Sequence, residues 1–287
     1  MTAPLDPRRF PYRDDIAADF LEGRVDAARY VAGSVHHIAA GNTAIRGKPD
    51  PASFATSEAL HGEIFAVYDR DGEWCWGQLE TDGYVGWIRA DDLAPGGIEP
   101  THRVSVAHSL RFPEPELKTP PLMALSMNAR VRVVSSTVTR GLDFAILEDG
   151  SAIPAGHLAP WGDFAEDHAA IALEFLNVPY LWGGRSSLGI DCSGLVQIAL
   201  AACGHASPRD TDMQADELGE ALPLPKSGAE VRRGDFLFWP GHVAIGLGDG
   251  EMVHATGAFM MVVREEIDPA LERMRATGTP LTGLRRV

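Results

Sequence analysis

The chain has 287 residues, of which 45% are hydrophobic and 23% charged, and its formal net charge is −15. This length allows two or three packed domains, and the strong negative charge argues against nucleic acid or an anionic membrane surface as a partner. Residues 1–11 lack the apolar core of a signal peptide, and no run of 18 apolar residues occurs. We therefore expect a cytoplasmic protein without a membrane span.

Residues 1–30 are expected to form a helical or irregular segment, with one helix from Asp14 to Tyr30 on the spacing of its apolar residues. Residues 31–98 then show turn signals at Asp71-Gly72 and Asp82-Gly83, a spacing typical of a small β-barrel. The strands expected there are Val31–Ala39, Glu63–Tyr68, Trp74–Leu79 and Tyr84–Ile88. The residues expected to pack rather than to bind ligand are Cys75, Cys203, Trp74, Trp76 and Trp87.

Residues 99–160 repeat this style and predict a second small all-β barrel, with a proline-rich connection over 113–121. Its expected strands are Arg103–Ala107, Ala129–Ser135, Phe144–Leu147 and Ser151–Pro154. Residues 161–287 change in composition and predict a helix-plus-antiparallel-sheet domain. Its expected elements are a helix capped by Asp163 and running to Leu176, a helix over Cys192–Cys203, and strands Phe236–Trp239, His242–Leu247 and Met252–Ala255. The predicted fold class of the chain is therefore α+β.

Cys192 follows a glycine-rich segment and opens an apolar helical run. A thiol at the first turn of a helix lies near unpaired backbone N–H groups and the positive end of the helix dipole, which favour the thiolate. The preceding Asp191 can be the helix N-cap, but its carboxylate would raise the thiol pKa, which hints at a further role such as binding a substrate ammonium group. Only three cysteines are present, which is no disulfide framework.

His242 and His254 lie on two strands joined at Gly248-Asp249-Gly250. If those three residues form the turn, Leu247 pairs with Glu251, and His254 lies opposite Ala244 on the same face as His242. A two-residue turn at Asp249-Gly250 would instead place the two rings on opposite faces. The three-residue turn is therefore a condition of the predicted site.

The three residues together predict a cysteine peptidase, with Cys192 as nucleophile and His242 as general base. His254 would hydrogen-bond the far nitrogen of His242 and fix its tautomer. Zinc binding by the same three side chains is the competing chemistry, but the chain lacks a paired-ligand motif, and we expect no metal and no cofactor.

These motifs resemble the NlpC-type (NlpC/p60) papain-like cysteine peptidases over about residues 161–287. The matching stretches are Tyr180-Leu181-Trp182-Gly183-Gly184, Asp191-Cys192-Ser193-Gly194-Leu195, Gly241-His242-Val243-Ala244-Ile245 and Val253-His254-Ala255-Thr256. The upstream half is similar to the paired bacterial Src-homology-3-like barrels of one subfamily, through stretches that include Leu60-His61-Gly62-Glu63 and Gly83-Tyr84-Val85-Gly86-Trp87. That subfamily is the γ-D-glutamyl-L-diamino-acid endopeptidases, or dipeptidyl-peptidase VI.

The resemblance implies a small muropeptide substrate with a free N-terminal L-Ala, cut between γ-D-Glu and diaminopimelate or lysine. It also implies roles for individual residues. Asp191 and Ser193 would hold the L-Ala-γ-D-Glu part, Tyr180 and Trp182 would line the cleft, and Tyr84 would close the cleft beyond L-Ala. The segment containing Arg209 and Thr211 would contribute on the carboxylate side, Arg209 above all.

One position departs from the subfamily pattern, because Phe54 stands where a glutamate usually grips the substrate ammonium group, and Glu58 follows four residues on. Free-amine recognition would then depend more on Asp191 and Tyr84. Two other functions remain open at this point: a thiol amidase or acyltransferase acting on another amide, and a non-catalytic protein that binds wall peptides.

Overall fold

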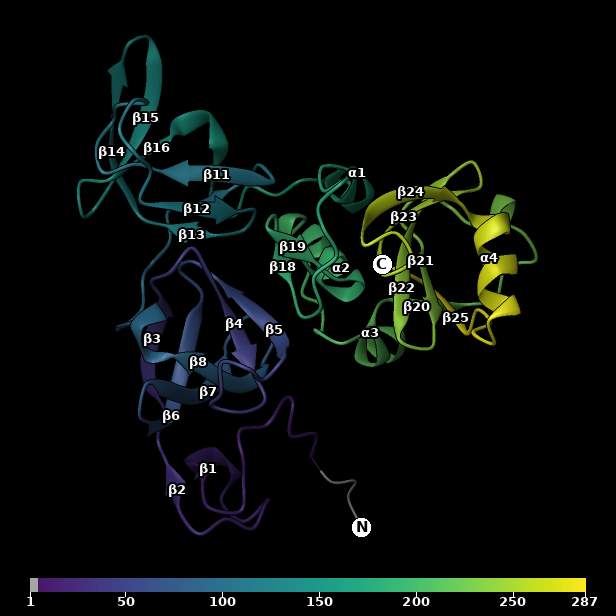
Figure 1. Ribbon diagram of the computed structural model, residues 1–287, viewed down its shortest axis with the longest axis horizontal. Coiled ribbons are helices and arrows are strands. Elements are labelled where there is room, and N and C mark those ends of the chain that lie inside the picture. The colour runs from purple at the N-terminus through teal and green to yellow at the C-terminus, as the bar shows by residue number, and fades with distance from the viewer. Residues whose placement is uncertain (1–4) are drawn as a thin grey trace. The chain divides into compact units, whose positions relative to one another are not determined.

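The computed structural model describes residues 5–287, and the chain divides into two compact units, one up to Trp161 and one from Gly162 onward (Figure 1). The first unit is built from β-strands, whereas the second combines helices with a six-stranded antiparallel sheet and a small two-stranded hairpin. The predicted α+β class is confirmed. Within residues 5–287, no helix is both long and apolar enough to cross a membrane.

The first unit begins with an irregular segment, and the predicted helix from Asp14 to Tyr30 is wrong. The strand β1 (Ala17–Ala18) pairs in parallel with β2 (Tyr30–Val31), and only the single 3₁₀ turn η1 (Asp19–Leu21) lies between them. Residues 16–18 are all completely buried. A surface helix buries one stripe of side chains, so three consecutive buried residues favour an extended backbone over an amphipathic helix.

A seven-stranded antiparallel sheet follows, with the strand order β5-β4-β8-β7-β6-β3-β9. Its strands are β3 (Ser34–Ile38), β4 (Asn42–Arg46), β5 (Ala55–Leu60), β6 (Ile64–Asp71), β7 (Trp74–Leu79), β8 (Val85–Arg89) and β9 (Leu93–Pro95). The short turn η2 (Ala90–Asp92) joins the last two. Cys75 lies in the core of this sheet, and the three predicted tryptophans pack with Ile16, so the prediction that they are packing residues is confirmed.

The rest of the first unit consists of three small antiparallel sheets, ordered β13-β10-β17, β11-β12 and β14-β15-β16. Their elements are β10 (His102–Val104), β11 (His108–Arg111), β12 (Met123–Ser126), β13 (Arg130–Val131), β14 (Val133–Thr139), β15 (Leu142–Leu147), β16 (Ala152–Pro154), η3 (Ala155–His157) and β17 (Leu158–Pro160). Val104, Leu125, Val131 and Ile153 form their shared core. The strands β11 and β12 border the proline-rich connection. The sequence predicted no strands at these positions.

The second unit is organised around a six-stranded antiparallel sheet in the order β20-β25-β21-β22-β23-β24. Its strands are β20 (Glu220–Leu222), β21 (Phe236–Trp239), β22 (His242–Gly248), β23 (Glu251–Thr256), β24 (Met261–Glu266) and β25 (Gly283–Arg286), and β18 (Arg185–Ser186) and β19 (Gly189–Ile190) form a separate small hairpin. Its helices are α1 (His168–Leu173), α2 (Cys192–Ala202), α3 (Thr211–Glu217) and α4 (Ile267–Ala276), with one 3₁₀ turn, η4 (Gly228–Glu230).

Helices cover both faces of this sheet. Figure 1 shows α2 and α4 on opposite sides of it, and α2 contacts β22 and β23. Ile267 and Ala270 of α4 pack on one face, against a cluster that includes Leu237, Ala244 and Met252. Side chains alternate along a strand, so the buried neighbours of Leu237, Ala244 and Met252 in the same strands point to the opposite face of the sheet. That face is the one on which α2 lies (Figure 1). The sheet is therefore an interior element that can hold polar groups away from water.

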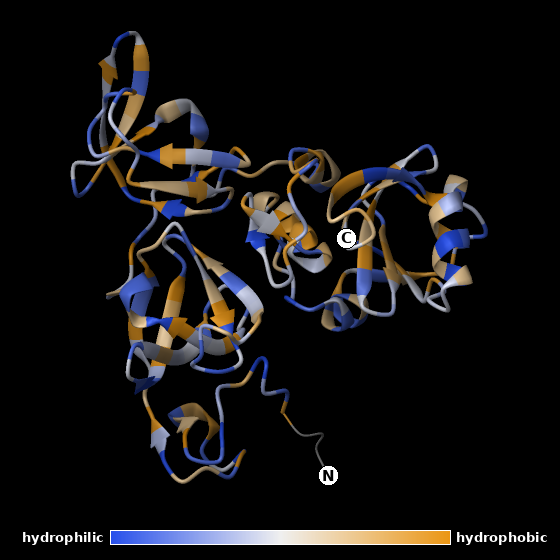
Figure 2. Cartoon of the chain, viewed as in Figure 1, coloured by the Kyte–Doolittle hydropathy of each residue, from blue (hydrophilic) through white to orange (hydrophobic). Residues whose placement is uncertain are grey.

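Helix α2 is the most buried helix of the unit, and Figure 2 colours it as mainly hydrophobic. Its Gly194 permits a close approach, because a Cβ atom there would lie 2.3 Å from the backbone oxygen of Gly184. The helix that precedes it, α1, is shorter than predicted. Asp167, not Asp163, is its N-cap, since the Asp167 side chain accepts hydrogen bonds from the backbone N–H groups of Ala169 and Ala170.

Candidate active site

Cys192 is the first residue of α2, and its sulfur lies beside the start of β22. The backbone N–H of Val243 donates a hydrogen bond to the sulfur, and the Thr211 hydroxyl lies 3.8 Å from it. Asp191 caps the helix, because its Oδ1 atom accepts a 2.8 Å hydrogen bond from the N–H of Gly194. Only 6% of Cys192 is exposed. The thiol is therefore held in a nearly dry position against Val243, the residue that follows His242 in the chain.

The two predicted histidines lie on the same face of neighbouring strands. Ile245 of β22 pairs with Val253 of β23, which places His254 opposite Ala244, as predicted. The rings meet, because Nε2 of His242 lies 2.9 Å from Nδ1 of His254. This contact leaves Nδ1 of His242 as the ring nitrogen available to a thiol.

The turn that produces this arrangement differs from the prediction. Leu247 does not pair with Glu251; Gly248 does, around the two residues Asp249 and Gly250. Both turn residues have positive φ, of 54° and 79°, as a type I′ hairpin requires. A β-bulge just before Gly248 adds one residue to β22 and so returns the two histidines to one face.

Two further residues extend the histidine pair. The Oε2 atom of Glu265, on β24, lies 3.1 Å from Nε2 of His254. Arg273 of α4 donates to both carboxylate oxygens of Glu265, at 3.0 Å to Oε2 and through a second contact to Oε1. A polar chain thus runs from His242 through His254 and Glu265 to Arg273.

Burial governs protonation at this site and corrects the expectation of a thiolate. It raises the pKa of the Cys192 thiol, the charge of Asp191 raises it further, and the donors around the sulfur do not compensate. Burial also lowers the pKa of His242 to about 3 and that of His254 to about 4. The resting site therefore holds a neutral thiol and neutral imidazoles, so that proton transfer accompanies attack rather than preceding it.

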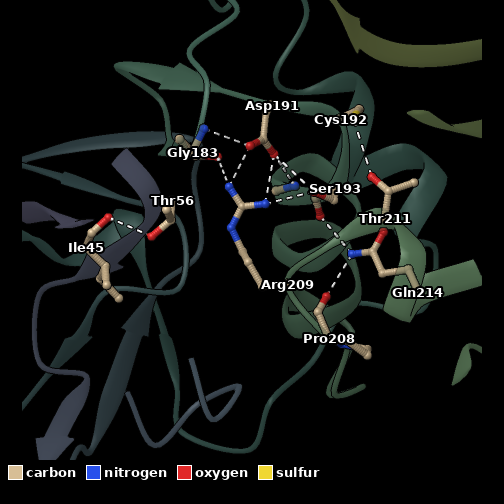
Figure 3. A network of polar contacts seen from close by, with 12 residues as sticks. Ile45, Thr56, Gly183, Asp191, Cys192, Ser193, Pro208, Arg209, Thr211 and Gln214 are labelled. Carbon is tan, nitrogen blue, oxygen red and sulfur yellow. Dashed lines mark hydrogen bonds and ion pairs between the residues drawn. The ribbon is translucent and has the colours of Figure 1, made fainter. Parts of the chain in front are cut away.

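A buried ion pair fixes the loop in front of α2 (Figure 3). Arg209 donates to both oxygens of Asp191, at 3.0 and 2.6 Å. The second oxygen of Asp191 also accepts from the backbone N–H of Gly183, at 2.9 Å. Arg209 further donates to the Ser193 hydroxyl at 2.8 Å, and that hydroxyl lies 3.3 Å from Asp191.

This network gives Arg209 partners within the chain, and its expected contact on the substrate's carboxylate side stays a prediction. Only 2% of Arg209 is exposed, and its guanidinium group bonds to Asp191 and Ser193. Asp191 and Ser193 are also buried and bond to one another and to Arg209. Their contact with substrate stays a prediction. Gln214 of α3 braces the same turn by donating to the backbone oxygen of Ser193 at 3.0 Å.

The other predicted substrate-binding residues differ in exposure. Trp182 is 62% exposed, whereas Tyr180 is partly buried. Burial is the main cause that raises the pKa of Tyr180, and the nearby Asp191 carboxylate adds to it. Its hydroxyl therefore stays protonated and can donate a hydrogen bond. The predicted roles of Trp182 and Tyr180 in lining the cleft stay predictions.

Two residues of the first unit were also predicted to affect substrate binding. Tyr84 packs in the core cluster of the seven-stranded sheet, and its predicted reach into the cleft stays a prediction. Phe54 is 75% exposed just before β5, whereas Glu58 on that strand is buried and accepts a hydrogen bond from Asn42. Glu58 is therefore engaged within its own sheet.

Sequence reasoning missed Glu265 and Arg273. Met252 of β23 pairs with Glu265, so Glu265 lies diagonally from His254, the same relation that links the two histidines. The signal in the sequence was an acidic residue on the strand after His254, at a position that faces the same side of the sheet as His254. Both ring nitrogens of His254 have hydrogen-bond partners, His242 and Glu265, which argues against His254 as a zinc ligand.

A thiol, a neutral histidine base and an orienting group on a helix-plus-antiparallel-sheet domain define a papain-like cysteine peptidase. Comparison with known families agrees: residues 177–271 match the NlpC/P60 family and residues 45–93 match the bacterial dipeptidyl-peptidase Sh3 domain. The chain therefore carries an NlpC/P60 cysteine peptidase domain preceded by a bacterial SH3 domain.

Curated relatives cover different shares of the chain. Dipeptidyl-peptidase 6 of Lysinibacillus sphaericus is 40% identical over 94 residues, which are 32% of this chain and 33% of that protein. Gamma-D-glutamyl-L-lysine dipeptidyl-peptidase of Bacillus subtilis is 28% identical over 69% of this chain and 71% of its own length. The protein of that name from Bacillus cereus is 27% identical over 70% of this chain and 67% of its own length.

A solved NlpC/P60 family protein from Bacillus cereus has the same fold, with a TM-score of 0.74 and 21% identity. The match covers 88% of this chain and 99% of that one. It supports the fold assignment for most of the chain.

We expect Arg209→Met to destabilise the second unit by about 3–5 kcal/mol, because it leaves the buried carboxylate of Asp191 without its cationic partner. Hydrogen exchange of the α2 amides in the full chain measures this loss. The matched control is Arg233→Met, which removes an exposed pair with Asp167 and should cost at most about 1 kcal/mol. Equal effects of the two substitutions would show that the buried pair does not hold α2.

We also expect kcat/KM for peptide hydrolysis to stay level from pH 7 down to about pH 5. The pKa of His242 lies near 3, below the ordinary 6.5, so the imidazole remains unprotonated and able to act as a base across this range. A pH–rate profile measures this directly, and the comparison stops near pH 5 because carboxylates titrate below it. An acid limb centred near pH 6.5 would show that His242 is solvated and that burial does not control it.

Proposed function

We propose that this protein is a cysteine peptidase that hydrolyses the bond between γ-D-glutamate and a diamino acid, diaminopimelate or lysine, in short peptidoglycan peptides. The observation that carries the proposal is the hydrogen-bonded pair of His242 and His254 in a domain of the NlpC/P60 family, together with the Cys192 thiol, which contacts the N–H of Val243 next to His242. The bond class comes from the relatives named gamma-D-glutamyl-L-lysine dipeptidyl-peptidase and from the dipeptidyl-peptidase SH3 match.

In this reaction, Nδ1 of His242 takes the thiol proton as the sulfur attacks the γ-carbonyl carbon of D-glutamate. The oxyanion that forms is stabilised by the backbone N–H of Cys192 at the first turn of α2 and by the neutral Tyr180 hydroxyl. The imidazolium of His242 then protonates the leaving amine of the diamino acid. Water, deprotonated by the same ring, hydrolyses the thioester and restores the thiol.

We propose that the substrate carries a free N-terminal L-Ala whose ammonium group is recognised through Asp191. Asp191 bonds mainly to Arg209, so its share in recognition is a modest electrostatic contribution from a paired carboxylate. Phe54 offers an exposed apolar surface where a relative's carboxylate is expected. This combination favours weak selection for the free amine over strict exclusion of blocked peptides.

The test is incubation with L-Ala-γ-D-Glu-meso-diaminopimelate and with its N-acetylated form, followed by mass spectrometry. We expect release of L-Ala-γ-D-Glu as one unit, faster from the free peptide, and loss of at least about 1,000-fold in rate with Cys192→Ala. Cys203→Ala is the matched control and should retain activity, since that thiol lies at the far end of α2.

No cleavage of either peptide by protein with a reduced Cys192 would contradict the proposed substrate. It would leave a thiol amidase or acyltransferase on another amide, or a binding protein, as the function.

We further propose that the protein acts in the cytoplasm on soluble peptides. The net charge of −15 supports this, because an acidic surface is repelled by anionic wall polymers but not by small peptides. Cell fractionation with immunoblotting tests the proposal and should place the protein with cytoplasmic markers. Recovery mainly outside the cytoplasmic membrane would contradict it.

A further inference from the structure

We infer that Glu265, held by Arg273, sets the direction of every ring proton in the histidine chain and so keeps Nδ1 of His242 unprotonated toward the thiol. Glu265 would be a positioning residue, since it touches His254 and not the reacting atoms. The inference deepens the proposed function and rests on it for the role of the reactive thiol. It assigns a job to a carboxylate and a guanidinium that the three-residue catalytic site does not use.

The first step decides whether Glu265 donates or accepts its hydrogen bond with His254. An ionised carboxylate only accepts hydrogen bonds, and Arg273 keeps it ionised by donating to both of its oxygens. Burial raises the pKa of Glu265, but the bonds and charges of Arg273 and His254 outweigh this and hold the pKa below its ordinary value. The 3.1 Å contact with His254 must therefore be donated by the Nε2–H of His254.

The second step extends the same donor-to-acceptor direction from His254 to His242. A neutral imidazole carries one proton, so His254 protonated at Nε2 has a lone pair at Nδ1. That lone pair accepts the 2.9 Å hydrogen bond from Nε2–H of His242. His242 then has its own lone pair at Nδ1. One carboxylate thus fixes the tautomers of two rings.

The third step is chemical. During attack the Cys192 S–H bond breaks, an N–H bond forms at Nδ1 of His242, and the ring becomes a cation that carries protons on both nitrogens. Its Nε2–H still donates to His254, which still donates to Glu265. The negative carboxylate therefore stabilises the imidazolium through one intervening ring. No proton moves beyond His242, and the chain is ready for protonation of the leaving amine.

Glu265→Gln tests the inference with almost no change in shape. Arg273 donates to both oxygens of Glu265, so in either orientation of the glutamine amide one Arg273 donor loses its acceptor. With the amide oxygen at the Oε1 position, an amide N–H points at Nε2 of His254. That N–H donates where Glu265 accepted, so both rings switch tautomer and His242 presents Nδ1–H to the thiol. We expect kcat on the tripeptide to fall about 100-fold or more, with KM changed less than about threefold.

The decisive readout is ¹⁵N NMR of the histidine rings in the full chain, which distinguishes protonated from unprotonated nitrogens without any substrate. We expect Nε2–H on both His242 and His254 in the wild-type protein and Nδ1–H on both in Glu265→Gln. A merely structural role would not exchange the tautomers. The rate of Cys192 alkylation by iodoacetamide should fall together with the tautomer exchange.

Glu266→Gln is the matched control, because it removes the same charge one residue later, at an exposed position, and should change neither tautomers nor kcat. Unchanged tautomers in Glu265→Gln, or a kcat within threefold of wild type, would overturn the inference. If the tautomers and alkylation rate change as expected but the wild-type protein does not cleave the tripeptide, the proposed substrate fails and the role of Glu265 stands.

Discussion

The burial of the Cys192 thiol at the tip of α2 is the constraint on which the site depends. A buried thiol resists ionisation, so the charge that a nucleophile needs must be created at the moment of attack by a base whose own pKa is lowered by burial. Neutral thiol and neutral imidazole are compatible with an apolar setting, whereas a standing ion pair would carry a large desolvation cost. The helices on both faces of the sheet provide that setting.

Placing the thiol requires the start of α2 to be rigid. The Asp191–Arg209 pair, the contact of Asp191 with the Gly183 N–H, and the N-cap bond to Gly194 hold the preceding loop against the helix. A carboxylate beside the nucleophile raises the thiol pKa, which is unfavourable for a thiolate. The pairing with Arg209 reconciles this position with catalysis, because Asp191 serves mainly as a structural anchor.

The sequence predicted the elements of the peptidase domain better than their details. The strand Phe236–Trp239 and the start of α2 at Cys192 agree with the prediction, because unbroken apolar runs between glycines leave few alternatives. The bulge before Gly248 could not be predicted, because hydrophobic alternation does not reveal an added residue. The contact of Glu265 with His254 and the ion pair of Arg209 with Asp191 were missed for a related reason. Their partners are set by strand register and by burial, which no local pattern contains.

The most direct test of this account is the thiolate absorbance near 240 nm, measured against pH with Cys192→Ala as the blank. We predict no thiolate signal from Cys192 at pH 7 and its appearance only above the ordinary thiol range, because burial and Asp191 raise the pKa. A thiolate band already complete at pH 5 would contradict the account. It would mean that the helix dipole and a charged His242 dominate, and that the site rests as an ion pair.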